Sequence, residues 1–558
     1  MDQRPWLKSY PAGVPGDIDP DRYASVVHAF HEACDRFKDK PCFTNMGVTL
    51  TYADLLRLSG QFAAFLRKDL GLVKGDRIGL QMPNVLQYPV ALFGALRAGL
   101  VVVNTNPLYT PREMEHQYRD SGVKAVVILA NFAKNLVEVL PNLKTGGAAP
   151  RVVVTEIGDL FPTPKRLIVN TVVKYVKKMV PAYDLPGAVS FRDALARGAA
   201  HPAVADVALV GSDLAFLQYT GGTTGVAKGA MLTHRNIIAN LEQASAWMSI
   251  RLVEGEEIIL TPLPLYHVFS LTVNCLLFMK YGGHNILVTN PRDFPAFIKL
   301  LQHQRFTVLT AVSTLLGALM NQPGFDRIDF SSVKLTVAGA MALQRAVADR
   351  WKALTKTTIV EGYGLTEASP ILCCNPIDGA DRLGTIGLPF PSTEVRLMDE
   401  EGQLVTAPGK AGELIARGPQ VMLGYWNKPD ETAGMLRDGW LWTGDIAQVD
   451  EAGFFKIVDR KKDMILVSGF NVYPSEVEEV VAMHPSIAEV GAIGVPDEKS
   501  GEAVKVVVVL RPGKTVTADE LVQFCRTSLA AYKVPRHVEF RTELPKTNVG
   551  KVLRRALR

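Results

Sequence analysis

The chain has 558 residues, of which 47% are hydrophobic, and a formal net charge of +5. This is more apolar material than one hydrophobic core uses, so several packed subdomains are expected. The mild net charge lacks the basic footprint of nucleic-acid-binding proteins, and the ten histidines form no cluster with metal-ligand spacing.

Helix and strand patterns alternate from residue 50 onward. Apolar residues at helical spacing predict a helix that includes Leu55, Leu58, Phe62 and Leu66, and residues 77–82 have the pattern of a short buried strand. The series continues with a helix over 89–98 and strands over 100–103 and 125–130. This rhythm predicts an α/β fold, with doubly wound subdomains in a large N-terminal domain.

The last hundred residues have a different pattern. Strands are predicted over 490–495 and 503–510, followed by a helix over 518–529, which indicates a small α+β domain. The polar run 459–463, whose side chains suit no core, predicts a hinge that makes this domain mobile. We therefore predict a large domain over 1–459, a hinge over 460–463 and a small C-terminal domain over 464–558.

The six cysteines show no C-x-x-C spacing, which argues against a zinc site or a redox motif and favours reduced, buried thiols. Residues 1–17 carry three prolines and two acids instead of an apolar core, so no secretory signal is predicted. Arg97 interrupts the most apolar run, 90–103, before it reaches membrane-spanning length. We expect a cytoplasmic protein that can meet the cytoplasmic face of the membrane.

Residues 219–229 form a loop of glycines, threonines and Lys228 after a predicted strand over 214–217. Glycines let backbone N–H groups approach an anion, the hydroxyls add hydrogen bonds, and Lys228 adds positive charge. The loop therefore predicts phosphate binding, although its spacing is not that of a Walker A motif.

This loop and residues 231–236 resemble the AMP-binding signature of the adenylate-forming superfamily. Five further motifs resemble the family's in the same order, at residues 264–267, 362–367, 442–445, 459–463 and 545–551. The resemblance covers residues 20–558. It implies an enzyme that uses ATP to convert a carboxylic acid to an acyl adenylate and then transfers the acyl group to coenzyme A, with Mg²⁺ as cofactor.

Glu367 follows a predicted strand over 358–360 and a Gly-Tyr-Gly turn, where a carboxylate can serve hydrated Mg²⁺ beside ATP phosphates. Thr366 can donate to the α-phosphate. His267 lies in an apolar segment, where a histidine is often structural, but its Leu-Tyr-His-Val-Phe context favours an active-site role. Together with Lys551, whose charge the resemblance assigns to the adenylation step, the candidate catalytic residues are Thr366, Glu367, His267 and Lys551.

The resemblance also implies a nucleotide site. Gly339 and Ala340 would border the acyl and adenine pockets, Tyr363 would pack on adenine, and Asp445 and Arg460 would bind the ribose. The implied nucleotide-binding positions are Thr220, Gly221, Gly222, Thr223, Thr224, Gly225, Lys228, Gly339, Ala340, Glu361, Gly362, Tyr363, Gly364, Asp445 and Arg460. Lys462 would be the pivot of a domain rotation that brings the coenzyme A contacts Ser468, Gly469 and Phe470 to the adenylate.

The acid is predicted from the apolar segment 263–278 and from closeness to bacterial long-chain fatty acyl-CoA synthetases, notably over 463–474 and 547–555. Phe269 is a candidate gate of the acyl site. The alternatives are a medium-chain or aryl acid CoA ligase, an acyl-AMP ligase serving an external carrier, and a non-catalytic acyl-binding protein. The charged set Lys228, Glu367, Asp445, Arg460 and Lys551 favours an enzyme; the oligomeric state stays open, a homodimer included.

Residues 167–180 lie between prolines and are predicted to form an amphipathic helix. The valines at 169, 172, 173, 176 and 180 share one face and Asn170, Lys174, Lys177 and Lys178 the other. Such a helix suits a membrane interface, with its valines in the lipid and its lysines near anionic headgroups, and it equally suits a surface helix packed on the protein's own core.

Overall fold

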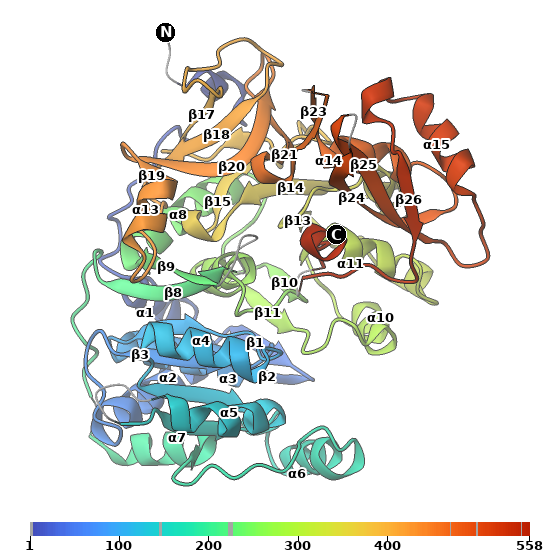
Figure 1. Ribbon diagram of the computed structural model, residues 1–558. Coiled ribbons are helices and arrows are strands. Elements are labelled where there is room, and N and C mark those ends of the chain that lie inside the picture. Colours follow the sequence, from blue (N-terminus) through green and yellow to red (C-terminus); the bar gives the residue numbers. More distant parts are fainter. Residues whose placement is uncertain are drawn as a thin grey trace.

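The computed structural model describes residues 4–143, 148–202, 204–220, 227–468, 470–497, 500–547 and 550–558. A large body carries a smaller C-terminal domain, in red at the upper right of Figure 1. This mixed α/β architecture confirms the predicted fold class.

The first sheet of the large body has seven strands in the order β7-β6-β5-β3-β4-β8-β9, parallel except for the last pair. Its central strands are continuous apolar runs because helices cover both faces. The strands are β3 (Arg77–Gln81), β4 (Val101–Asn104), β5 (Ala125–Leu129), β6 (Arg151–Thr155), β7 (Val189–Ser190), β8 (Leu214–Thr220) and β9 (Lys228–Thr233).

The second sheet has nine strands in the order β16-β15-β14-β13-β12-β10-β11-β1-β2. The six strands from β14 to β1 run parallel, and the antiparallel strands β15, β16 and β2 lie at its edges. Its strands are β1 (Pro41–Asn45), β2 (Val48–Thr51), β10 (Ile258–Thr261), β11 (His284–Leu287), β12 (Val308–Ala311), β13 (Leu335–Ala338), β14 (Ile359–Gly364), β15 (Ile371–Cys374) and β16 (Leu388–Pro389).

Helices pack against these two sheets (Figure 1). Three of these helices begin at capping boxes that the sequence contains: the side chains of Thr51, Thr110 and Thr233 each accept a hydrogen bond from the backbone N–H three residues on. The α-helices of the large body are α1 (Val26–Phe37), α2 (Tyr52–Lys68), α3 (Gln87–Arg97), α4 (Pro111–Ser121), α5 (Ala133–Val139), α6 (Lys165–Thr171), α7 (Phe191–Ala200), α8 (His234–Met248), α9 (Phe278–Lys280), α10 (Phe294–His303), α11 (Ser313–Leu319), α12 (Arg345–Thr355) and α13 (Pro429–Met435).

A third, five-stranded sheet leads to the hinge. It contains β17 (Glu394–Met398), β18 (Gly412–Arg417), β19 (Leu436–Arg437), β20 (Trp440–Val449) and β21 (Phe455–Arg460). The 3₁₀ turn η8 (Lys461–Asp463) follows directly and coincides with most of the predicted hinge.

The small domain is one five-stranded sheet with two helices and its own core. Its elements are β22 (Ile465–Val467), β23 (Phe470–Val472), α14 (Pro474–Ala482), β24 (Ile487–Asp497), β25 (Gly501–Leu510), α15 (Ala518–Arg526) and β26 (His537–Phe540). The predicted strands and helix of this region are therefore confirmed, with β24 longer than expected. After β26 the chain returns toward the large body near α11 (Figure 1).

Three sequence predictions need correction. Gly362, Tyr363 and Gly364 form no turn; they end strand β14 and pair with β15. Asp459 is buried, against the prediction that the polar run holds no core residue, because it accepts hydrogen bonds from Ser475 N and the Arg554 guanidinium.

The third correction concerns residues 167–180. They form α6 and the short π-helix η4 (Val172–Val176), and Val169 and Val173 pack against the core of the large body. Asn170 also turns inward, and its Oδ1 accepts from Gly158 N at 2.8 Å. The predicted valine face is therefore divided: Val169 and Val173 meet the core, whereas Val176 is exposed. Leu167, Ile168, Tyr175 and Met179 are exposed as well.

The contact between α2 and α7 generates a stability prediction. A Cβ at Gly198 would lie 1.8 Å from the Gln61 carbonyl oxygen, so Gly198→Ala should force these helices apart and destabilise the chain by about 1–3 kcal/mol or more. Gly434→Ala is the matched control, because Gly434 is an exposed position in α13 with no atom near its Cβ. It should stabilise by up to about 1 kcal/mol. Urea unfolding measures both, and equal effects would contradict the packing argument.

Candidate functional site

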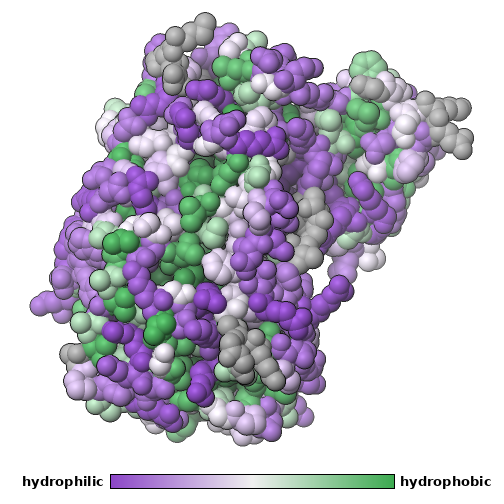
Figure 2. Space-filling model, turned by 60° about the vertical axis from the view of Figure 1, so that its left-hand side comes forward, coloured by the Kyte–Doolittle hydropathy of each residue, from purple (hydrophilic) through white to green (hydrophobic). Residues whose placement is uncertain are grey.

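A cavity of about 680 Å³ lies between the large body and the small domain. In Figure 2 the small domain is a separate lobe, and hydrophilic side chains border the recess beside it. Thirteen of the predicted site residues line the cavity: Thr220, Lys228, His267, Gly339, Ala340, Gly362, Tyr363, Gly364, Thr366, Glu367, Arg460, Lys462 and Lys551.

Other predicted residues lie elsewhere. Glu361 and Asp445 are buried behind the lining. Gly221, Gly222, Thr223, Thr224, Gly225 and Gly469 lie outside the described residues. Ser468 and Phe470 are exposed on the small domain and do not line the cavity, and the Phe470 ring stacks on Tyr532.

The two ends of the glycine-threonine loop are held together by the hairpin of β8 and β9, in which Thr220 pairs with Lys228. Both residues therefore enter the cavity at the same sheet edge. The Lys228 ammonium lies 5.1 Å from the centroid of the Tyr425 ring, a cation–π distance that holds the charge beside the loop.

Glu367 stands opposite on the 3₁₀ turn η7 (Thr366–Ala368), and it is buried. Its Oε1 accepts a hydrogen bond of 2.5 Å from the Tyr425 hydroxyl. Burial and the Glu367 charge raise the pKa of Tyr425, so its hydroxyl stays protonated and continues to donate. Tyr425 thus joins Lys228 and Glu367 into one unit.

Tyr425 was missed by sequence reasoning. Its loop is tied to β9 by three backbone hydrogen bonds, Met231 N to Gly424 O, Leu423 N to Met231 O and Trp426 N to Gly229 O. The available signal was the Gly-Tyr-Trp run at 424–426, because binding residues are often on loops that a rigid scaffold positions.

A second polar unit surrounds Asp445. Tyr363 donates to Asp445 Oδ2 at 2.6 Å, and Arg460 Nε lies 2.6 Å from Oδ1. Asp445 and Arg460 are register partners on β20 and β21, so the sheet itself fixes this pair. Each carboxylate oxygen keeps a further lone pair, so Asp445 can still accept from ligand hydroxyls.

Lys551 reaches the cavity from the small domain on a tight turn. Its N–H bonds Thr547 Oγ1 and its carbonyl accepts from Thr547 N, at 3.1 and 2.7 Å. Gly550 has φ +82°, and a Cβ there would lie 2.6 Å from Thr314 Oγ1 on α11. Glycine therefore permits the close approach of the two domains.

Lys551 is half-buried. Burial, and next the nearby Arg460 charge, lower the pKa of Lys551 below its ordinary value. An anion in the cavity would therefore stabilise the charged form of Lys551.

Arg554 ties the C-terminal tail to the hinge. Its guanidinium lies 2.7 Å from Asp459, 2.8 Å from Glu478 on α14 and 3.3 Å from Asp463. Lys461 meanwhile pairs with Glu413 of the large body at 2.8 Å. These ion pairs hold the hinge in the orientation that places Lys551 in the cavity.

Another part of the cavity is apolar. Its lining includes Ala244, Trp247, Met248, Val268, Phe269, Val273, Leu277, Cys374, Ile377 and Phe390. Some residues of segment 263–278 line the cavity. The remaining apolar residues of the π-helix η5 (Ser270–Leu277) belong to the hydrophobic core.

The six cysteines are free and all buried, as predicted.

Phe269 and His267 stand where the polar and apolar parts meet. A Cβ at Gly339 would lie 3.2 Å from the Phe269 ring and 3.3 Å from Gly362 O, so glycine leaves room for the ring. Burial lowers the pKa of His267 to about 4. The imidazole is therefore neutral at pH 7, and it can position a ligand but supplies no charge.

Comparisons with known proteins agree with this geometry. The model of the AMP-binding enzyme family matches residues 30–426, and that of the AMP-binding enzyme C-terminal domain matches residues 476–551. A long-chain-fatty-acid–CoA ligase of Escherichia coli O157:H7 is 56% identical over 99% of this chain and 97% of its own. One from Bacillus subtilis is 40% identical over 100% and 98%.

Among solved structures, an anthranilate CoA ligase in complex with anthranoyl-AMP has a TM-score of 0.84 at 26% identity. The likeness covers 96% of each chain. Both domains are thus part of the similarity.

Glu361 generates a pH prediction. It is buried on β14, accepts from Leu343 N at 3.3 Å, and burial raises its pKa to about 8. Because the unfolded chain ionises near the ordinary carboxyl pKa, this group lowers stability as pH rises from about 4.5 to about 8. Glu361→Gln should remove that loss, which amounts to at most about 1.4 kcal/mol per pH unit.

Urea unfolding between pH 5 and 8 measures the difference in free energy between the variant and the parent chain. That difference should grow with pH for Glu361→Gln. For the control Glu401→Gln, at an exposed loop position, it should stay constant. A constant difference for both variants would contradict the buried, protonated state of Glu361.

Proposed function

The chain belongs to the AMP-binding enzyme family, and we propose that it is a ligase that activates a long-chain fatty acid with ATP and transfers the acyl group to coenzyme A. The products are acyl-CoA, AMP and pyrophosphate. The observation that carries this function is one cavity in which Lys228, Glu367 and Lys551 lie on the same lining as an apolar wall. Full-length identity of 50–56% to several long-chain-fatty-acid–CoA ligases favours a long-chain acid over an aryl or medium-chain acid.

In the first half-reaction, a carboxylate oxygen of the acid attacks the α-phosphorus of ATP. The bond from that phosphorus to the bridging oxygen breaks, and pyrophosphate leaves with the electron pair. Lys228 and Lys551 offset the developing negative charge, and Thr366 donates to the α-phosphate. The fatty tail lies against the apolar lining, whose burial contributes about 0.8 kcal/mol per methylene.

The residues present fit a Mg²⁺ ion that accompanies ATP. Among the described residues, no group of three or more His, Cys, Asp or Glu side chains could hold a metal ion. Mg²⁺ commonly uses one or two protein carboxylates and takes its other ligands from water and phosphate. Glu367, with Oε2 free of the Tyr425 bond, would hold it. When bound, it neutralises phosphate charge.

In the second half-reaction, the thiolate of coenzyme A attacks the acyl carbon, and AMP leaves from the mixed anhydride. Lys551 serves only the first step, so the small domain rotates about Lys462 between the two. Rotation carries Lys551 out and brings the region of Ser468 and Phe470 to the adenylate. The exposure of the Phe470 ring supports this assignment, because an exposed aromatic side chain is free to meet a ligand.

One experiment separates the alternatives. Pyrophosphate release and thioester formation are measured together for acids from acetate to oleate, with benzoate and ferulate included. Long-chain acids should give both products with the highest kcat/KM. Pyrophosphate without thioester would indicate an acyl-AMP ligase, and a preference for benzoate would indicate an aryl acid ligase.

The role of Lys551 yields the next prediction. Lys551→Ala should slow adenylation by roughly 10²-fold or more, because it removes a partly desolvated charge at the reacting phosphate. It should still convert supplied acyl-AMP and coenzyme A to thioester at nearly the parent rate. Lys546→Ala, which removes a surface partner of Glu489, is the control and should spare both steps. Equal slowing of both half-reactions by Lys551→Ala would refute the two-orientation mechanism.

We also propose a cytoplasmic location with contact to the membrane surface. Across the described parts of the chain, no helix is long and apolar enough to span a bilayer. The exposed apolar residues of α6 and η4 lie among Lys174, Lys177 and Lys178, which are also exposed. This combination suits shallow insertion into an anionic surface, at the end of the molecule away from the small domain (Figure 1).

The membrane proposal is tested with anionic vesicles. Changing Lys174, Lys177 and Lys178 to Glu together should weaken binding at least roughly 100-fold, since each lysine contributes about 1 kcal/mol near such a surface. The control makes the same charge change at the exposed Lys352, Lys410 and Lys514 and should bind as the parent does. Equal loss in both triple variants would show that net charge alone governs binding.

A further inference from the structure

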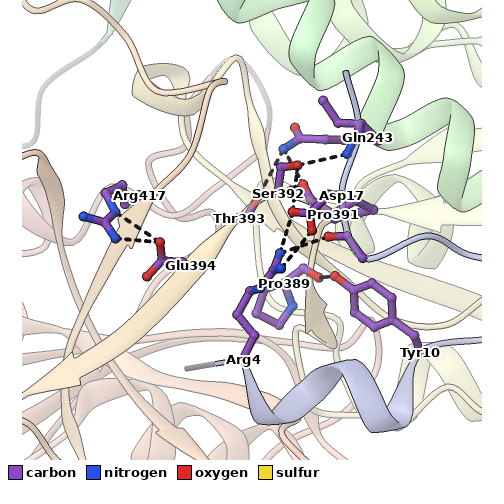
Figure 3. Close-up of polar contacts among 12 residues, drawn as sticks. Arg4, Tyr10, Asp17, Gln243, Pro389, Pro391, Ser392, Thr393, Glu394 and Arg417 are labelled. Carbon is purple, nitrogen blue, oxygen red and sulfur yellow. Dashed lines mark hydrogen bonds and ion pairs between the residues drawn. The ribbon is translucent and has the colours of Figure 1, made fainter. Parts of the chain in front are cut away.

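The first described residues, 4–18, form a strap across the outside of the large body. The strap begins with the 3₁₀ turn η1 (Pro5–Ser9) and runs beside the segment 389–394, as Figure 3 shows. It lines none of the cavity itself. The strap nevertheless contacts a residue that belongs to the cavity's apolar lining.

The strap is anchored along its whole length. The Trp6 side chain is buried, with its ring 6.1 Å from that of Phe455, and Ser9 Oγ donates to Ala452 O at 2.7 Å. At the other end, the Asp17 carboxylate accepts hydrogen bonds from the Arg4 guanidinium at 2.6 and 2.8 Å and from Ser392 Oγ at 3.2 Å (Figure 3). The Ser9 and Ser392 hydrogen bonds join the strap to residues 443 and 375 positions away, and the Arg4–Asp17 pair joins its two ends, so the strap is a fixed part of the wall.

The centre of the strap is Tyr10. Its hydroxyl donates to Pro389 O at 2.5 Å, and its ring meets the Trp247 ring edge-on at 5.2 Å and 88°. Trp247 in turn lies 5.3 Å from Phe390. Trp247 and Phe390 line the cavity and Tyr10 does not, so Tyr10 forms a second layer behind Trp247, which in turn packs on Phe390.

Other hydrogen bonds fix the Trp247 ring and the backbone next to Phe390. Trp247 Nε1 donates to Asn375 O at 3.0 Å, and Gln243, one turn earlier on α8, donates to Pro391 O at 2.7 Å. Tyr10 packs on the Trp247 ring edge-on, so it opposes movement of that ring in its own direction. A tightly packed aromatic layer of this kind resists displacement, because any movement must also displace its neighbour.

We infer that the strap sets the upper limit of acyl chain length, with Tyr10 as the positioning residue that keeps Trp247 and Phe390 closed against a longer tail. The inference rests on the proposed fatty acid ligase activity. Each further methylene improves binding while apolar lining remains to cover it, and the gain ends where the tail meets a wall that cannot move. Removing the Tyr10 ring leaves space into which Trp247 can turn.

The test is the chain-length profile of kcat/KM over even-numbered saturated acids from octanoate to docosanoate, each normalised to octanoate. Tyr10→Ala should extend the profile by two or more carbons, with a rise of roughly tenfold for the first acids beyond the parent's limit, expressed mainly in KM. Tyr10→Phe keeps the ring, loses only the bond to Pro389 and should stay close to the parent. Ser9→Ala, in the same strap but away from Trp247, should leave the profile unchanged.

The outcomes are distinguishable. If the parent chain uses no fatty acid, the proposed function fails. If the parent has a chain-length limit that Tyr10→Ala leaves in place, or if all acids slow equally, the strap inference fails and Tyr10 is merely structural. Should Tyr10→Ala not fold, Tyr10→Leu keeps apolar bulk without the flat ring, and an unchanged limit in that variant overturns the inference as well.

Discussion

The ammonium group of Lys551 sits in a cavity that the large body builds, while its own backbone belongs to the small domain. A cation partly withdrawn from water in this way is costly unless an anion meets it, and its lowered pKa reflects that cost. The position depends on a glycine at 550, on contact with Thr314, and on the ion pairs that Arg554 makes with the hinge. The closed arrangement of the two domains is therefore an electrostatic as well as a steric fit.

The same principle organises the large body's side of the cavity. Lys228, Tyr425 and Glu367 form one linked unit, and Tyr363, Asp445 and Arg460 form another. Each unit holds its charged groups by fixed partners before any ligand arrives, which limits the reorganisation needed during reaction. His267 and Glu361, by contrast, are kept neutral near pH 7 by burial. Positive and negative charge is thus confined to the polar part of the cavity.

The apolar part has a different construction, in which shape is the governing property. Aromatic rings from α8 and from the loop after β16 form its lining, and residues 4–18 support those rings from outside. Catalytic charge and acyl recognition therefore depend on separate segments of the chain. Changes in the strap can alter substrate range without touching the groups around the phosphates.

The sequence by itself determined the α/β rhythm, the small α+β domain and the ordered motifs, because helix and strand periods and glycine-rich loops are local properties of consecutive residues. It also identified Lys228, Glu367 and Lys551 as candidate site residues, and in the structure all three line one cavity. Only the tertiary structure decided which face of α6 meets solvent, that Asp459 is buried, and that Tyr425 and Tyr10 support the site. Those outcomes depend on partners far away in the chain: an amphipathic stripe has the same period whether it covers a core or a membrane, and a polar residue can be buried wherever distant donors satisfy it.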